Sequence, residues 1–150
     1  MKKYLSLIML ILTTHIYALN LKPEGYWDIQ NISNPKVSPN GEKVLFTKRY
    51  IDKINDSFIT EIWLMDADGE NKRLFTDGSN VRWSPDGKKV AFTKADENDK
   101  SQLFLKFLGS DVETKITNSD KAIKDFAWSK NGKFIAYSCL LYTSPSPRDG

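Results

Sequence analysis

The sequence predicts an all-β protein built from repeats of one supersecondary unit. Three stretches share a pattern, and they read NPKVSPNGEKVLFTK, NVRWSPDGKKVAFTK and DFAWSKNGKFIAYS. Their serines, Ser38, Ser84 and Ser129, lie 46 and 45 residues apart, and a steady period in this range is typical of repeat architectures. Within the repeats, β-branched and aromatic residues alternate at period two and turn residues recur often, so helices are not expected there.

Each repeat begins with a predicted hairpin. A short apolar run precedes Ser-Pro-Asn-Gly or Ser-Pro-Asp-Gly, and an alternating run such as KVLFT follows. Proline presets φ at the first turn position, Asn or Asp tolerates the second, and glycine adopts a positive φ without a Cβ clash. The pattern therefore predicts two antiparallel strands joined by a tight turn. In the third repeat Lys130 and Asn131 replace proline and aspartate, which the turn also accepts.

Two further strands complete each unit. In the first repeat they are predicted at Glu61 to Asp66 and in a short run ending at Thr76; in the second, at Gln102 to Leu108 and in a run ending at Thr117. Four antiparallel strands in about 40–45 residues are typical of a β-propeller blade. We therefore expect a partial β-propeller of two four-stranded blades and the first strands of a third. The predicted boundaries are residues 34–78, 79–120 and 121–138.

The links between second and third strands are charged in both complete repeats. They run from Lys48 to Ser57 (KRYIDKINDS) and from Lys94 to Ser101 (KADENDKS). Such links can contact a ligand, but charged hairpin loops are usually solvated, and we interpret both as solvated loops.

The start of the chain has the pattern of a secretory signal peptide, which we assign to residues 1–18. Lys2 and Lys3 precede an apolar core from Leu5 to Leu12, and Ala18 offers a small residue for cleavage. The core is shorter than the about 20 residues of a membrane-spanning helix. We expect a secreted or periplasmic protein with no stable membrane span after cleavage; an uncleaved membrane tether is the alternative. Residues 19–33 form a lead-in segment, in which Pro23 to Gln30 are compatible with a short helix.

The end of the chain changes character after Ser138. Residues 139–150, CLLYTSPSPRDG, look like the in-frame translation of a transposase adapter used to prepare sequencing libraries. A natural Pro/Ser linker is the alternative. We expect an adapter-derived tail and a truncated open reading frame.

Composition excludes several classes of site. Removing Lys2, Lys3, Arg148 and Asp149 with the two ends lowers the net charge from +3 to about +1, so nucleic acid is not an expected partner. The single histidine, His15, lies in the leader, and the single cysteine, Cys139, lies in the tail. A Ser/His/Asp triad needs an imidazole, and no G-x-S-x-G motif occurs. We predict no catalytic, cofactor-binding or metal-binding residue and no cofactor.

Recurring aromatic residues indicate packing between blades rather than a ligand platform. Trp83 and Trp128 occupy one repeat position, which Val37 takes in the first repeat. A second set of matching positions, also expected in the core between blades, is Phe46, Phe92 and Tyr137.

From Leu21 to Ser138 the chain resembles the propeller of the prolyl oligopeptidase family of serine peptidases, particularly its acylaminoacyl-peptidase and dipeptidyl-peptidase-like members. The run LKPEGYWDI before the first repeat is as similar as the Ser-Pro-Asn-Gly and Ser-Pro-Asp-Gly hairpins. The resemblance implies a propeller that limits substrate size and positions short peptides above a C-terminal α/β-hydrolase domain with a Ser-Asp-His triad. That domain is absent here, so no catalytic residue of the family can be assigned and the fragment itself is given no activity.

A non-catalytic propeller is the competing interpretation. The periplasmic TolB-like proteins have similar repeats, which serve protein binding. They place a separate α/β domain before the propeller, whereas here the first repeat begins soon after the signal peptide. The peptidase interpretation is therefore favoured.

Overall fold

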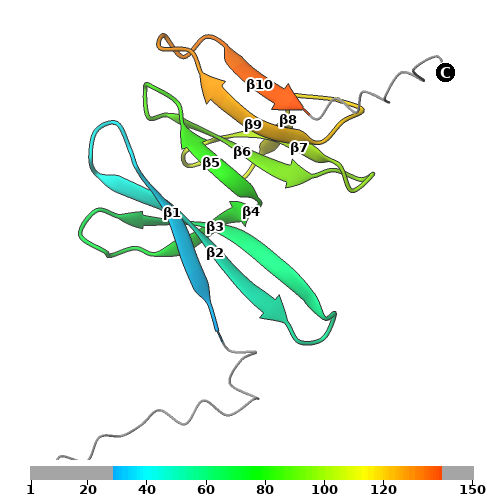
Figure 1. The fold of residues 1–150 in the computed structure, drawn as a ribbon. Coiled ribbons are helices and arrows are strands. Elements are labelled where there is room, and N and C mark those ends of the chain that lie inside the picture. Colours follow the sequence, from blue (N-terminus) through cyan, green and yellow to red (C-terminus); the bar gives the residue numbers. More distant parts are fainter. Residues whose placement is uncertain (1–28, 140–150) are drawn as a thin grey trace, which may run out of the picture.

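The computed structural model describes residues 29–139 and arranges them in three antiparallel sheets (Figure 1). Residues 1–28 lie outside the described residues, and with them the predicted signal peptide and most of the short helix predicted at Pro23 to Gln30. Residues 140–150 of the predicted tail lie outside them as well. Ile29 and Gln30 carry no regular secondary structure. No helix that could cross a lipid bilayer occurs in the described part of the chain.

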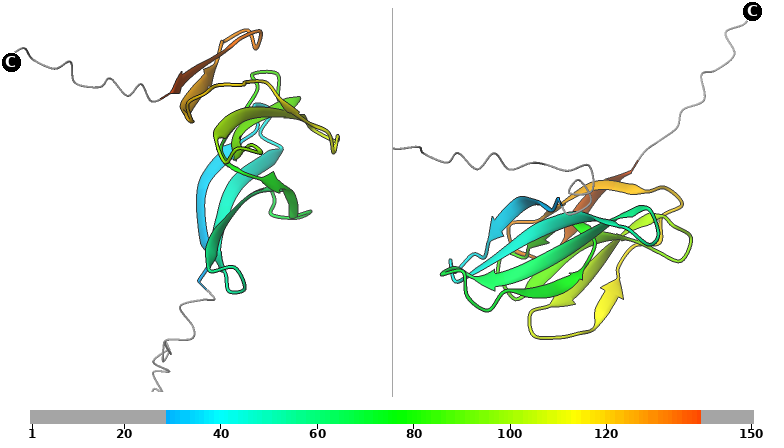
Figure 2. Two further views of the ribbon diagram at one scale, coloured as in Figure 1. Left: turned by 90° about the vertical axis from the view of Figure 1, so that its right-hand side faces the viewer. Right: turned by 90° about the horizontal axis from the view of Figure 1, so that it is seen from below.

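The sheets follow the predicted repeats. The first holds β1 (Asn31–Val37), β2 (Lys43–Asp52), β3 (Ser57–Asp66) and β4 (Arg73–Asp77), in that order. The second holds β5 (Ser79–Trp83), β6 (Lys89–Ala95), β7 (Ser101–Phe107) and β8 (Glu113–Lys115), again in order. A hairpin of β9 (Ile123–Trp128) and β10 (Ile135–Cys139) begins the third. Figure 2 shows the sheets stacked in chain order, which confirms the predicted all-β, partial β-propeller architecture.

The hairpin between β2 and β3 differs from its prediction. The segment from Lys48 to Ser57 is not a loop, because β2 continues to Asp52 and β3 begins at Ser57. Unbroken cross-strand pairing runs from Lys48 opposite Glu61 to Asp52 opposite Ser57. Lys48 lies opposite Glu61, and Tyr50 and Phe58 each lie opposite an isoleucine. Pairs of opposite charge and pairs of an aromatic with a β-branched residue stabilise a sheet. In blade 2 the corresponding link is also shorter than expected, at residues 96–100.

The Ser-Pro-x-Gly turns have the predicted geometry and also stack on one another. Ser38 Oγ accepts a hydrogen bond of 2.9 Å from the Lys43 amide, and Ser84 and Ser129 repeat this contact. Gly87 has a φ of +69°, and a Cβ there would lie 3.4 Å from the Cδ of Pro39 in the preceding turn. Likewise, a Cβ on Gly132 would lie 3.4 Å from the Cδ of Pro85. Successive turns therefore form a column along one edge of the stacked blades.

Replacing Ser84 by Ala should lower the free energy of unfolding by about 1–3 kcal/mol, the usual cost of an unsatisfied buried polar group. Ser84 is buried, its Oγ donates to Asp86 and accepts from the Lys89 amide, and the substitution leaves that amide unpaired. Urea denaturation measures the loss. Ser110→Ala is the control, because the hydrogen bond from the Val112 amide to Ser110 Oγ is exposed. An equal loss in the control would contradict the buried-turn explanation.

Two apolar cores join the blades. In the first, Leu45, Ile62, Leu64 and Phe75 from blade 1 meet Val81, Val90 and Phe92 from blade 2. In the second, Ala91 and Leu103 from blade 2 meet Ile123 and Phe126 from blade 3. The hydrophobic contact is thus between sheets, so each blade is stabilised by its neighbours.

The recurring aromatic positions show how each blade faces its predecessor. Trp83 packs against the first core and donates from Nε1 to the Lys36 carbonyl of blade 1 at 2.8 Å. Trp128 packs against the second core, and Phe92 is completely buried in the first. Phe46, at the equivalent position in blade 1, is buried on the face turned away from blade 2.

Val37 and Tyr137 are the exceptions among these positions. The prediction that they pack in a core between blades is wrong, because their side chains are 61% and 50% exposed. Tyr137 lines a depression over blade 2 with Leu103 and Leu105. Within the described residues β10 pairs only with β9, so no third strand covers this tyrosine from its open side.

Candidate functional site

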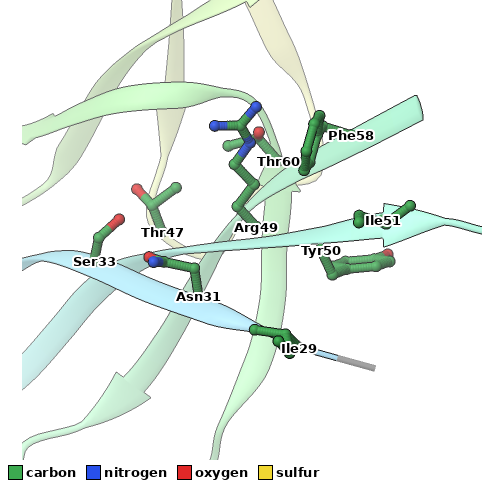
Figure 3. Close-up of a pocket in the computed structure, with 9 residues that line it drawn as sticks. All are labelled: Ile29, Asn31, Ser33, Thr47, Arg49, Tyr50, Ile51, Phe58 and Thr60. Carbon is green, nitrogen blue, oxygen red and sulfur yellow. The ribbon is translucent and has the colours of Figure 1, made fainter. Parts of the chain in front are cut away.

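A cavity of about 340 Å³ lies where β1 begins and the β2–β3 hairpin extends (Figure 3). Three strands contribute to it, and every lining residue from β2 and β3 except Thr47 comes from the extended part of the hairpin. The lining residues are Ile29, Asn31, Ser33, Thr47, Arg49, Tyr50, Ile51, Phe58 and Thr60. Three of them, Arg49, Tyr50 and Ile51, fall in the segment that was predicted to be a solvated loop.

Strand register brings the polar groups of this cavity together. Ser33 lies opposite Thr47, and Asn31 lies opposite Arg49 on the paired strands β1 and β2. Arg49 in turn lies opposite Thr60 of β3. Because residues directly opposite one another share a face of a sheet, these side chains converge, and Figure 3 shows Thr47 and Arg49 on the same side of β2.

Arg49 brings a positive charge to the cavity. Its guanidinium carbon lies 4.0 Å from the centre of the Phe58 ring. Among residues 29–139 it forms no ion pair. Thr47 is only 5% exposed, and its Oγ1 has no hydrogen-bond partner in the described part of the chain. The cavity thus holds a cation and a buried hydroxyl that can both donate hydrogen bonds.

The carboxylates near Arg49 in the sequence are engaged elsewhere. Glu61 accepts hydrogen bonds of 2.8 Å from the Tyr50 hydroxyl and from Trp63 Nε1. The hydrogen bond to Glu61 raises the pKa of Tyr50. Asp52 accepts from Asn55 Nδ2 at 2.6 Å and from the Ile54 amide at 2.9 Å, and these bonds lower the pKa of Asp52. Both carboxylates therefore serve local structure.

A second polar cluster lies at the junction of the blades and is internally neutralised. Lys94 Nζ lies 2.7 Å from Asp77 Oδ1 and 3.0 Å from Glu113 Oε2. Lys106 Nζ, which is buried, donates to the Phe75 carbonyl at 2.8 Å and lies 3.7 Å from Glu113. A shallow cavity of about 440 Å³ beside this cluster shares Phe58 and Thr60 with the first. The Lys94–Asp77 ion pair and the hydrogen bond from Lys106 to the Phe75 carbonyl tie blade 1 to blade 2.

Asp77 in this cluster should contribute to a loss of stability in acid. Burial would raise the pKa of Asp77, but the hydrogen bond and charge of Lys94 outweigh it and lower the pKa below the ordinary 3.8. A lowered carboxyl pKa stabilises the fold above the ordinary value, and this contribution is lost as the pH falls through the folded pKa. Thermal melts at decreasing pH should show Tm falling below pH 3.8. Asp77→Asn should make that fall smaller, whereas Asp111→Asn, at an exposed position outside the strands, should leave it unchanged.

No site residue was assigned from the sequence, and residues 29–139 contain no group of three or more His, Cys, Asp or Glu placed to hold a metal ion. Arg49 could have been noticed in the sequence because the residue at this repeat position differs between the two blades. Arg49 and Ala95 both lie 11 residues after the turn serine of their blade. An arginine that the repeat does not require indicates a local role.

Solved structures with the same fold include peptidase propellers. Acylaminoacyl peptidase from Pyrococcus horikoshii superposes with a TM-score of 0.66 at 19% identity, over 75% of this chain and 18% of the peptidase. The propeller domain of the trilobed protease from Pyrococcus furiosus gives 0.64 at 22% identity, over 75% of this chain and 34% of that chain. TolB from Acinetobacter baumannii superposes with a TM-score of 0.50 at 18% identity, over 77% of this chain and 39% of the TolB chain.

No protein-family model and no curated protein matches the sequence. The chain spans less than a fifth of the length of the acylaminoacyl peptidase. Acylaminoacyl peptidases, which the repeats resemble, are thus among the structural neighbours, at low identity. Residues 29–139 have the fold of the β-propeller part of these peptidases, with two complete four-stranded blades and the first hairpin of a third.

Proposed function

We propose that this chain is the N-terminal propeller portion of a secreted serine peptidase that hydrolyses short peptides. In this proposal the propeller gates access to a C-terminal α/β-hydrolase domain, which supplies the Ser-Asp-His triad. The observation that carries it is the likeness to the acylaminoacyl-peptidase propeller over 75% of the chain, at a TM-score of 0.66. The lead-in run LKPEGYWDI and the hairpin repeats support the same assignment.

The contacts between blades suit a gate. A filter that selects substrates by size must keep its opening narrow, so its blades must not separate easily. Here an apolar core, the hydrogen bond from Trp83 Nε1 to the Lys36 carbonyl and the bond from Lys106 Nζ to the Phe75 carbonyl all join blades 1 and 2. The apolar core and the Lys106 contact are buried, and close-packed buried contacts make neighbouring sheets move together.

The test is the substrate-length dependence of the full-length gene product. It should cleave chromogenic dipeptides and tripeptides, lose this activity on treatment with a serine-directed phosphonate, and leave casein intact. Removing residues 34–120, which form the two complete blades, should allow cleavage of longer substrates. Absence of any hydrolysis by the folded full-length protein would contradict the proposal.

A TolB-like binding protein is the second candidate, supported by the TolB propeller at a TM-score of 0.50. It predicts a full-length protein without peptidase activity. The TM-score of the TolB propeller is lower than the 0.66 and 0.64 of the peptidase propellers, so the peptidase is preferred.

Secretion belongs to this proposal and has its own test. Cleavage after Ala18 would give a mature chain that begins at Leu19. Amino-terminal sequencing of the protein from the periplasm or medium should therefore yield LNLKPEG. A chain that keeps residues 1–18 and sediments with membranes would support a tether instead.

A further inference from the structure

We propose that the cavity at Arg49 binds the carboxylate of a ligand that carries an adjoining apolar group, as the C-terminal residue of a short peptide does. The inference concerns residues 29–139 alone and holds whether or not the whole protein is a peptidase.

Within residues 29–139 Arg49 has no acidic partner, whereas several other cations of the two blades do. Lys43 pairs with Asp66 at 2.6 Å, for example, and Lys115 with Glu97 at 3.1 Å. Arg49 forms no ion pair within the described residues and instead stacks on Phe58. Stacking on an aromatic face fixes the plane of a guanidinium while its edge N–H groups stay available, and this edge matches a carboxylate.

Equivalent threonines in the two blades differ in their hydrogen bonding. Thr47 and Thr93 both lie nine residues after their turn serines, opposite Ser33 and Ser79. In blade 2 the threonine is satisfied, because Thr93 Oγ1 donates to the Ser79 carbonyl at 3.2 Å and lies 3.2 Å from Ser79 Oγ. In blade 1 the Thr47 hydroxyl has no partner in the described part of the chain. A buried hydroxyl without a partner costs free energy that a bound acceptor would recover.

The wall of the cavity adds an apolar surface beside these donors. Phe58 is 59% exposed although it is a large apolar residue, and Ile29 and Ile51 also line the cavity. Blade 2 has no counterpart of this wall, because its β6–β7 hairpin is shorter. The volume of about 340 Å³ is at the lower end of the range for small-ligand pockets. One cation, hydroxyl donors and an apolar wall fit a singly charged carboxylate with an apolar side chain.

The experiment is an NMR titration of the ¹⁵N-labelled 150-residue chain, following the Arg49 Nε–Hε resonance. The probes are N-acetyl-leucine, N-acetyl-leucinamide and sodium acetate. We expect a saturable shift with N-acetyl-leucine, binding at least about tenfold weaker with acetate, and no saturable shift with the amide. Equal shifts with the acid and the amide, or equal affinity for acetate and N-acetyl-leucine, would overturn the proposal.

Variants separate binding from folding. Arg49→Met should abolish saturable binding, followed through backbone amides of β2 and β3, while Arg73→Met, a charge loss on β4 outside the cavity, should not change it. Thr47→Val should weaken binding several-fold yet leave the Tm of the free chain unchanged or raised, because it removes a hydroxyl without a partner. A lowered Tm with unchanged affinity in Thr47→Val would assign this residue to structure alone and contradict its place in the site.

Discussion

Replacing Phe92 by Ala is expected to lower the free energy of unfolding by about 3–5 kcal/mol, the usual cost of truncating a buried aromatic side chain. Phe92 is 0% exposed and packs with Leu45 and Ile62 in the core between blades 1 and 2. Its ring also lies 6.0 Å from that of Phe104, centre to centre. The loss is measured by urea denaturation followed by tryptophan fluorescence, since Trp83 reports from the edge of the same core.

Phe107→Ala is the matched control, because Phe107 belongs to the same blade but is about half exposed. We expect a loss of less than about 1 kcal/mol there, since surface truncations have small effects. Equal losses for the two variants would mean that the contact between the blades does not contribute to stability as described.

The second large effect is expected from Gly78→Ala, at the crossing from β4 of blade 1 to β5 of blade 2. Gly78 has a φ of +135°, and an added Cβ would lie 2.7 Å from the Thr93 carbonyl oxygen and 3.1 Å from Phe92 Cδ2. The backbone strain alone costs about 1–3 kcal/mol, and the clash must also displace a buried strand. Thermal and urea unfolding of the variant measure the total.

Gly69→Ala separates strain from clash. Gly69 also has a positive φ, +93°, but no atom lies within 4 Å of the position that a Cβ would take. Gly69→Ala should therefore lower the free energy of unfolding only by the conformational cost of the positive φ. Gly78→Ala should lower it distinctly more. If the two variants are equally destabilised, the close approach of Gly78 to Thr93 is not important for the fold.

Much of the fold was predictable because its determinants are local and repeated. Ser38, Ser84 and Ser129 mark turns whose proline and glycine requirements are set within a few residues, and strand order follows from short connections. The length of β2 and β3 was not predictable from composition, since the charged run after Lys48 resembles a loop. Only its cross-strand partners, such as Glu61 for Lys48, show that it is a strand.

The candidate site was missed for a related reason. Arg49, Thr47 and Ser33 converge only when β1, β2 and β3 pair in a specific register, and one sequence position carries no information on that pairing. The exposure of Tyr137 likewise depends on which strands lie beside β10. What the sequence did contain is a contrast between blades, with Arg49 standing where blade 2 has Ala95. Comparing equivalent repeat positions can therefore find sites that motif searches do not.

Sequencing the source DNA downstream of the Ser138 codon is the most direct test of the peptidase assignment. We expect further repeats at a spacing of about 45 residues, followed by a G-x-S-x-G motif with a later Asp and His in the same frame. A frame that ends after the propeller without that motif would refute the assignment and place the protein among the non-catalytic propellers.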